Sequence, residues 1–333
     1  MIIVKAPLRI SIGGGGTDLP SYYQNFESTF ISAAINKYIY ISVHPIFIPE
    51  IILKYSEMEK VKSPNDIKHP IVREALKLVG INSALEISSF ADIPSGTGLG
   101  SSGTFTVALL KALYTFKNIN HNNLSLAEDA CRIEIEKLGA PIGKQDQYIS
   151  SVGGLTRFHI DKSGVVTAKA LEMDQHSRTD LEEHLLLFFT GYSRSANDLL
   201  QEQDQATKAA TSTIGAPSND MIENLHFTKD LGMKIGHALE KGNLTEFGTL
   251  MNTHWAYKKK RSKIMSSGQI DKWYDIAMNN GAIGGKLIGA GGGGFLMFLA
   301  DDKRRLRKAL RDAGMQDVPF RFDNLGAQVV LHD

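Results

Sequence analysis

The segment Pro94–Thr104 has the composition of a loop that holds phosphate. It reads P-S-G-T-G-L-G-S-S-G-T and leads into a pattern typical of a long helix. Its glycines let the backbone turn without Cβ clashes, and free N–H groups at a helix start attract an anion. The hydroxyls of Ser101 and Ser102 can reach a phosphate oxygen or Mg²⁺. The segment matches neither G-x-x-x-x-G-K-[ST] nor the dinucleotide fingerprint, which needs an acidic residue about 20 positions later.

A second glycine cluster, Gly13–Gly16, directly precedes Thr17 and Asp18. A flexible turn that presents a carboxylate and a hydroxyl suits paired hydrogen bonds to the hydroxyls of a polyol. The alternative is a plain turn in which Asp18 is the N-cap of the next helix. These residues leave both interpretations open.

A third cluster consists of Gly289 and Gly291–Gly294 and is followed by an apolar segment, residues 295–299. Ordering four consecutive glycines costs much backbone entropy, and a plain hairpin does not need them. We therefore expect the backbone here to approach a ligand closely.

Two acidic residues, Glu134 and Asp146, flank a turn that contains Gly139, Pro141 and Gly143. Glu134 is expected on a helix that runs toward Gly139, so the chain can bring both carboxylates toward one point. Such a pair suits one metal ligand and one proton acceptor. The alternative is that both are solvated surface charges.

The composition sets the frame for these motifs. A chain of 333 residues predicts about two domains. Its 37 basic and 36 acidic residues give a net charge of +1, which provides no global reason to bind nucleic acid or an anionic membrane. The single cysteine, Cys131, excludes an internal disulfide. The apolar N-terminal stretch is interrupted by Lys5, Pro7 and Arg9. We expect a cytoplasmic protein that binds its anions locally.

The pattern of apolar residues predicts an α+β fold in two layers. A capping box at Ser125 and Glu128 would start the second predicted helix, and residues 207–219 read as a linker between two helices. Strands are expected over residues 2–12, 30–44, 85–90, 153–159, 165–170, 185–190 and 327–331, and helices over 104–116, 125–138 and from about 302.

Three segments, in the same order along the chain, resemble the motifs of the GHMP family of small-molecule kinases. Residues 94–102 resemble its P-x-x-x-G-L-G-S-S phosphate loop, residues 5–18 its N-terminal substrate motif, and residues 286–295 its C-terminal glycine-rich motif. The resemblance implies a two-domain GHMP kinase fold. Residues 1–180 would form an N-terminal ribosomal-protein-S5-like α/β domain with a left-handed βαβ unit, and residues 181–333 a ferredoxin-like α+β domain.

The resemblance also implies which residues bind ATP and Mg²⁺. Ser102, with Ser101 as the alternative, would help to hold the metal ion. Glu134 would be its other ligand, because the spacing from Glu134 to Asp146 is similar to that in galactokinases. Gly103 stands where many relatives have Ala, a change that we expect to matter little since both are small. The residues expected to bind ATP are Pro94, Gly96, Thr97, Gly98, Leu99, Gly100, Ser101 and Ser102.

By the same resemblance, Asp146 would accept or orient the proton of the acceptor hydroxyl. Arg9 would favour the ionised hydroxyl or stabilise charge on the moving phosphoryl group. The residues expected to contact the acceptor are Gly16, Thr17, Asp18, Arg194, Gly291 and Gly292.

Several further segments, among them G-G-G-T-D-L-P-S-Y-Y and N-T-H-W-A-Y-K-K-K-R, are similar to the family branch that acts on heptose 7-phosphate and on fucose. The resemblance implies phosphorylation of the C1 hydroxyl of D-glycero-D-manno-heptose 7-phosphate, on the way to a nucleotide-activated heptose for surface polysaccharide. A kinase of a free sugar such as L-fucose and a non-catalytic regulator are the alternatives. The expected partners are ATP and a sugar phosphate, without nucleic acid or membrane, and a homodimer stays open.

A sugar phosphate needs cations at a distance from its reacting end. Arg194 is the favoured residue, because Ser193 and Ser195 leave its guanidinium accessible. Lys286 and the run Lys258–Arg261 are the other candidates. That run can equally be the solvated face of a helix.

Overall fold

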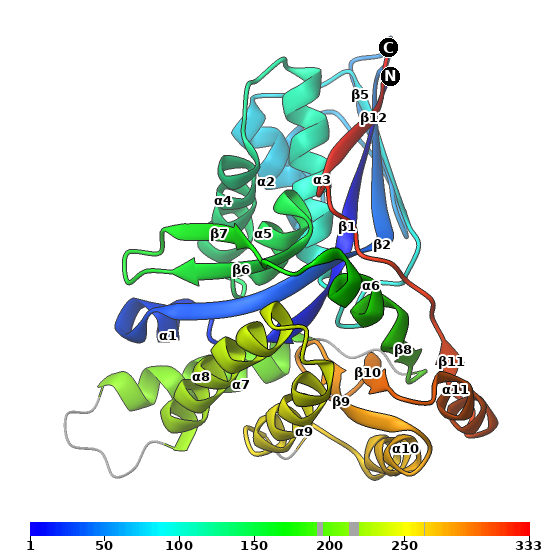
Figure 1. Cartoon of the computed structure of the whole chain (residues 1–333). Coiled ribbons are helices and arrows are strands. Elements are labelled where there is room, and N and C mark those ends of the chain that lie inside the picture. The colour runs from blue at the N-terminus through cyan, green and yellow to red at the C-terminus, as the bar shows by residue number, and fades with distance from the viewer. Residues whose placement is uncertain (192–195, 213–219, 263) are drawn as a thin grey trace.

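The computed structural model describes residues 1–191, 196–212, 220–262 and 264–333, and these form two β-sheets with helices packed against them (Figure 1). The first sheet has eight strands in the order β12-β1-β2-β5-β3-β4, with β6 pairing with β2 and β7 with β6. Its strands are β1 (Ile2–Gly13), β2 (Ser28–Pro45), β3 (Ile51–Lys54), β4 (Met58–Val61), β5 (Leu85–Ala91), β6 (Leu155–Ile160), β7 (Val166–Ala170) and β12 (Gln328–His332).

The long strand β2 organises the first sheet. Its first part, residues 28–33, pairs with β6, and its last part, residues 39–45, pairs with β5, while β1 runs antiparallel beside it. The β1–β2 register shifts between Pro7 and Leu8. Proline cannot donate a hydrogen bond to a ladder, so a bulge is expected there. The bulge lies two residues before Arg9.

The second sheet has the order β11-β8-β10-β9, that is, the 4-1-3-2 order of a ferredoxin-like β-α-β-β-α-β unit. Phe295, Met297 and Leu299 of β10 join a core shared with the first sheet, while Leu296 and Phe298 join a second core on the opposite face. This alternation buries both faces of the strand. The strands are β8 (Leu185–Phe189), β9 (Ala282–Ile288), β10 (Phe295–Ala300) and β11 (Gln316–Asp317).

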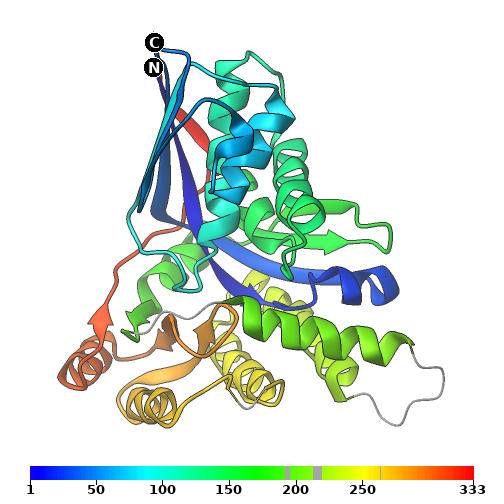
Figure 2. The same ribbon diagram turned by 180° about the vertical axis from the view of Figure 1, so that it is seen from behind.

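The helices cover both sheets. Helices α3 and α5 pack on β1 and β2, α8 also packs on those two strands, and α9 packs on β9. Figure 2 shows from behind how the helices of residues 70–152 lie against one face of the first sheet. The helices are α1 (Pro20–Phe26), α2 (Pro70–Val79), α3 (Ser101–Phe116), α4 (Asn123–Cys131), α5 (Gln145–Val152), α6 (Gln175–His184), α7 (Ala196–Ser212), α8 (Asp220–Glu240), α9 (Leu244–Lys259), α10 (Gly268–Met278) and α11 (Lys303–Asp312), with a 3₁₀ turn at Pro64–Asp66 and a π-helical segment at Arg132–Lys137.

Two local expectations are wrong. The N-cap of α4 is Asn122, which forms its capping box with Ser125, whereas Glu128 binds Lys144 instead. The predicted linker at 207–219 is helical up to Ser212, and its remainder lies outside the described residues.

The C-terminal strand returns to the first sheet. β12 pairs antiparallel with β1, with Val4 opposite Val329, so the two ends of the chain lie side by side in Figure 1. The predicted boundary between the two domains, at residues 180 and 181, stays a prediction. β12 follows that boundary in the sequence but belongs to the first sheet, whose other strands precede it. Within the described ranges, no helix is long and apolar enough to cross a bilayer.

Candidate active site

A cavity of about 1060 Å³ gathers most of the predicted functional residues. Its wall includes the phosphate loop, the first glycine cluster, the turn before α5, α9 and the end of β9. These segments come from both halves of the sequence. The site is therefore assembled by the tertiary fold.

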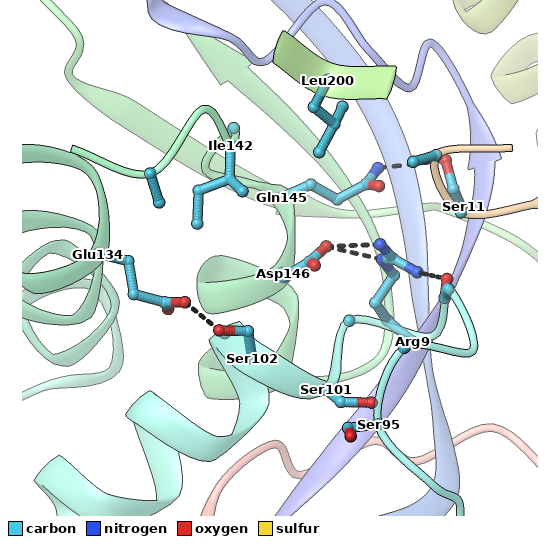
Figure 3. Close-up of a pocket in the computed structure, with 18 of the residues that line it drawn as sticks. Arg9, Ser11, Ser95, Ser101, Ser102, Glu134, Ile142, Gln145, Asp146 and Leu200 are labelled. Atoms are coloured by element: carbon cyan, nitrogen blue, oxygen red, sulfur yellow. Dashed lines mark hydrogen bonds and ion pairs between the residues drawn. The ribbon is translucent and has the colours of Figure 1, made fainter. Parts of the chain in front are cut away.

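Arg9 and Asp146 form the central ion pair of this cavity. Arg9 extends from β1, and its Nε and Nη2 atoms each lie 2.8 Å from Oδ1 of Asp146 in the first turn of α5. The guanidinium also donates to the carbonyl of Gly98 in the phosphate loop. Figure 3 shows the two side chains facing each other. Because both bonds use Oδ1, the second carboxylate oxygen of Asp146 is left for another partner.

Glu134 lies beside this pair but has a different environment. It is 2% exposed and accepts a hydrogen bond from Ser102 (Figure 3) and another, at 2.9 Å, from Gln147. Burial raises the pKa of Glu134, while the bonds from Ser102, Gln147 and Thr106 lower it. No cation pairs with this carboxylate among the described residues. A buried carboxylate that faces a hydroxyl fits the oxygen ligands of Mg²⁺.

Glu134 lies on a helix, as predicted, and this part of the helix is the π-helical segment Arg132–Lys137. One extra residue per turn bulges the backbone, and such segments are frequent at functional sites. The segment follows α4 without a break. It places Glu134 opposite the first turn of α3.

The phosphate loop contains glycines in the left-handed region and leads directly into α3. Gly96, Gly98 and Gly100 have φ angles of 76°, 85° and 82°, in the left-handed region that favours glycine. α3 begins at Ser101 without a side-chain cap, so its first N–H groups are available to an anion. The hydroxyl of Ser101 is buried, lines the cavity and has no partner. The loop therefore fits a phosphate.

Not every predicted ATP residue lies in the cavity wall. Pro94, Thr97 and Leu99 are absent from the wall. The Thr97 hydroxyl donates to the carbonyl of Pro94, and Leu99 is fully buried, so these contacts stabilise the loop. Gly103 has a stricter role than expected. A Cβ atom there would lie 2.7 Å from Cβ of Asp146, so the expectation that alanine would matter little is wrong.

The third glycine cluster contacts the phosphate loop. A Cβ atom at Gly289 would lie 2.6 Å from Cα of Gly98, and one at Gly294 would lie 2.2 Å from the Thr97 carbonyl. Gly289 and Gly294 thus allow close approach to another backbone, and Gly289 also lines the cavity, so close approach of this cluster to a ligand stays a prediction. Gly291 lines the cavity, whereas Gly292 donates its N–H to the Met265 carbonyl and is not part of the wall.

The first glycine cluster positions Asp18. Its carboxylate accepts from the N–H groups of Gln145 at 3.1 Å and Gly16 at 3.2 Å, and burial raises its pKa. The N-cap of α1 is Leu19, so Asp18 is not a helix cap. Gly16 and Asp18 line the cavity, but the buried Thr17 hydroxyl bonds to Gly14 and lies outside its wall. Contact of the acceptor with Thr17 stays a prediction.

The basic residues that were candidates for binding phosphate differ in burial. His254, Lys258 and Arg261, at the C-terminal end of α9 and just beyond it, and Lys286 on β9 are all buried and line the cavity; we call them the basic cluster. The solvated-face interpretation is wrong for Lys258 and Arg261, although it holds for the exposed Lys259 and Lys260. Arg194, the favoured phosphate residue, lies outside the described residues.

Some cavity residues were missed by sequence reasoning. Gln145 lines the wall and donates to Ser11 at 3.3 Å (Figure 3). An aromatic wall consists of His69 stacked on Phe105, with Tyr55 against the edge of His69. Gln145 is next to Asp146 and was a visible candidate. The aromatic residues come from three separate segments and have no common pattern in the sequence.

Comparisons with known proteins agree with this geometry. The profile of the GHMP kinases N terminal domain matches residues 68–154, and the GHMP kinases C terminal profile matches residues 237–314. The chain is 29% identical to D-glycero-alpha-D-manno-heptose 7-phosphate kinase of Campylobacter jejuni over 98% of both chains. It is 24% identical to L-fucokinase/L-fucose-1-P guanylyltransferase of Bacteroides fragilis, over 92% of this chain and 36% of that protein.

The fold has the same relatives. The structure of a D-glycero-D-manno-heptose 1-phosphate kinase from Bacteroides thetaiotaomicron superposes with a TM-score of 0.81, at 24% identity over the whole of both chains. The strand order of the two sheets and the phosphate loop at the start of α3 agree with the matches to both domain profiles. The chain therefore belongs to the GHMP kinase family and is a sugar kinase, a phosphotransferase with an alcohol group as acceptor.

Proposed function

We propose that this chain is a Mg²⁺-dependent sugar kinase that transfers the γ-phosphate of ATP to the C1 hydroxyl of D-glycero-D-manno-heptose 7-phosphate. The observation that carries the proposal is the Arg9–Asp146 ion pair, whose guanidinium also binds the phosphate loop. It joins a proton acceptor to the nucleotide side of the cavity. The choice of sugar is supported by the Campylobacter jejuni relative, which this chain matches over 98% of its length.

The nucleotide is bound by two kinds of surface. The N–H groups at the start of α3 and the Ser101 hydroxyl hold its phosphates, and the wall of Tyr55, His69 and Phe105 takes the flat adenine ring. Ser102 and Glu134 would hold Mg²⁺, which when bound neutralises charge on the β- and γ-phosphates.

The transfer step needs little covalent chemistry from the protein. The acceptor proton moves to the free oxygen of Asp146. The acceptor oxygen forms a bond to the γ-phosphorus as the bond to the β–γ bridging oxygen breaks, and ADP leaves. Arg9 keeps Asp146 oriented and offers positive charge to the moving phosphoryl group. Asp18 and Gln145 are placed to bind sugar hydroxyls.

A second candidate is a kinase of a free sugar such as L-fucose. The Bacteroides fragilis relative supports it, since L-fucokinase is part of that protein's name. Turnover of the phosphorylated and the free sugar, compared under the same conditions, separates the two.

The first prediction tests Asp146. Replacement Asp146→Asn keeps the shape but removes the proton acceptor, so kcat should fall by about 10²- to 10⁴-fold. A coupled ATP assay with heptose 7-phosphate measures the rate, and ³¹P NMR identifies the product. Asp312→Asn, an exposed residue of α11, is the control and should keep full activity. Full turnover by Asp146→Asn would refute the role of Asp146.

A further inference from the structure

We propose that the basic cluster binds the phosphate group that the acceptor already carries, as distinct from the phosphate that is transferred. The cluster consists of His254, Lys258, Arg261 and Lys286. This inference rests on the proposed kinase function and adds the residues that recognise the 7-phosphate of its acceptor. Arg194, the residue favoured from the sequence, lies outside the described residues.

The first argument is uncompensated charge. Among the described residues, no carboxylate forms an ion pair with Lys258, Arg261 or Lys286, although each is less than 10% exposed. Burying a cation without a counter-ion is expensive, and folded proteins pair such groups or place them where a ligand supplies the charge. The Asp18 carboxylate favours the charged form of Arg261 without forming an ion pair with it, so one carboxylate faces three basic side chains on this cavity wall. The excess of positive charge indicates an anion as the missing partner.

The second argument is the number of unused hydrogen-bond donors. Lys286 donates to the Ile12 carbonyl at 2.8 Å and contacts Nδ1 of His254 at 3.2 Å, which leaves one of its three N–H groups. Lys258 donates to the carbonyls of Leu287 and Gly289. The Nε2 atom of His254 is buried and has no partner. Donors that line a cavity and lack acceptors fit the oxygens of a phosphate.

The third argument is position. Lys286 is anchored to the end of β1 through Ile12, and Arg261 donates to the Gly15 carbonyl at 3.3 Å. A Cβ atom at Gly16 would lie 2.5 Å from Arg261, so this glycine admits the guanidinium. The cluster thus borders the glycine cluster that carries Asp18. The nucleotide phosphates already have their own site at the start of α3.

Electrostatics supports the same assignment. Burial, and then repulsion from Arg261 and Arg9, lowers the pKa of Lys258 to about 7. Burial and neighbouring cations also hold the pKa values of Lys286 and His254 well below their usual ranges. A bound dianion would reverse this repulsion and favour the charged forms.

The test compares Lys258→Met with Lys260→Met. Methionine keeps most of the length of the side chain without its charge, and Lys260 is the exposed neighbour whose ammonium lies over the ring of Tyr257. Loss of Lys258 should raise KM for heptose 7-phosphate about 10- to 100-fold. The ratio of kcat/KM for heptose 7-phosphate to kcat/KM for free heptose should fall by a similar factor, KM for ATP should change much less than KM for the sugar phosphate, and Lys260→Met should match the wild type.

Two results would overturn the proposal. If Lys258→Met raises KM for ATP but not for the sugar phosphate, the cluster belongs to the nucleotide. If wild type uses free and phosphorylated heptose equally well, no distal phosphate is recognised, although the kinase function stands. Lys286→Met is the second variant, and thermal unfolding verifies that both variants fold.

Failure of the proposed function is visible separately. If wild type phosphorylates neither sugar, calorimetry with heptose 7-phosphate and with inorganic phosphate still tests the cluster. The proposal is supported if the wild type and Lys260→Met bind these ligands and Lys258→Met does not. Equal binding by all three proteins refutes it.

Discussion

At the scale of single residues, environment separates two carboxylates that the sequence only places near each other. Asp146 is paired with Arg9, whereas Glu134 is buried among neutral groups from Ser102 and Gln147. The ion pair stabilises a charged carboxylate that can act on the acceptor. The buried carboxylate lacks a cation and is suited to a metal ion. One carboxylate therefore serves proton transfer and the other metal binding in our proposal.

This difference predicts the effect of Glu134→Gln. The amide preserves the shape but removes the charge that would hold Mg²⁺, so the Mg²⁺ concentration for half-maximal rate should rise about tenfold or more. Titration of Mg²⁺ at saturating ATP and acceptor measures it. Glu136→Gln, an exposed residue of the same π-helical segment, is the matched control. An unchanged Mg²⁺ dependence in Glu134→Gln would remove Glu134 from the metal site.

The residue types of the site were largely predictable, but their burial was not. Motif resemblance identified Arg9 and Asp146, and the structure brings them together. The run at 258–261 was read as one feature, although the chain buries Lys258 and Arg261 and exposes Lys259 and Lys260. Helical spacing would have separated them, because Phe247, Met251 and His254 continue the buried face of α9 to Lys258.

At the scale of elements, two glycine-rich loops from different sheets touch backbone to backbone. Gly289 follows β9 and approaches Gly98 of the phosphate loop too closely for a Cβ atom on either residue. Sequence alone showed two clusters of glycine. It could not show that each requires the other, because the contact joins residues almost 200 positions apart and depends on how the sheets pack.

The contact predicts that Gly289→Ala displaces the phosphate loop. The new Cβ atom would lie 2.8 Å from the Gly98 carbonyl, so KM for ATP should rise about tenfold or more. Gly314→Ala is a matched control, because Gly314 has the same φ of 86° but no atom within 4 Å of the place its Cβ would take. Both variants share the cost of a left-handed alanine, about 1–2 kcal/mol. Equal ATP kinetics in the two variants would contradict the prediction.

At the scale of the whole molecule, the basic cluster should make stability depend on pH. The pKa of Lys258 is about 7 in the folded chain and 10.5 in the unfolded chain, so the unfolded state binds more protons between these values. The free energy of unfolding should then rise with pH, by about 2 kcal/mol between pH 7 and pH 9 from this residue.

Urea unfolding of wild type and Lys258→Met at both pH values isolates that contribution. The wild type should gain about 2 kcal/mol of stability relative to the variant between pH 7 and pH 9. The loss of the hydrogen bonds from Lys258 to the Leu287 and Gly289 carbonyls lowers the stability of the variant equally at both pH values. Arg261 and Arg9, the charged groups that lower the pKa of Lys258, are present in both proteins and cancel in the comparison. A difference that does not change with pH would show that Lys258 is charged in the folded protein.

The pairing of β12 with β1 has a consequence for how the chain acquires this fold. Residues 328–332 complete the first sheet only after the whole second sheet has been synthesised between them and β1. Until then the outer edge of β1 lacks its neighbour, and an unpaired edge is open to other strands. Closing the contact joins residues more than 300 positions apart and carries the entropy cost of a long loop. The strand that carries Arg9 is therefore among the first made, but it cannot be fully paired until residues 328–332 have been made.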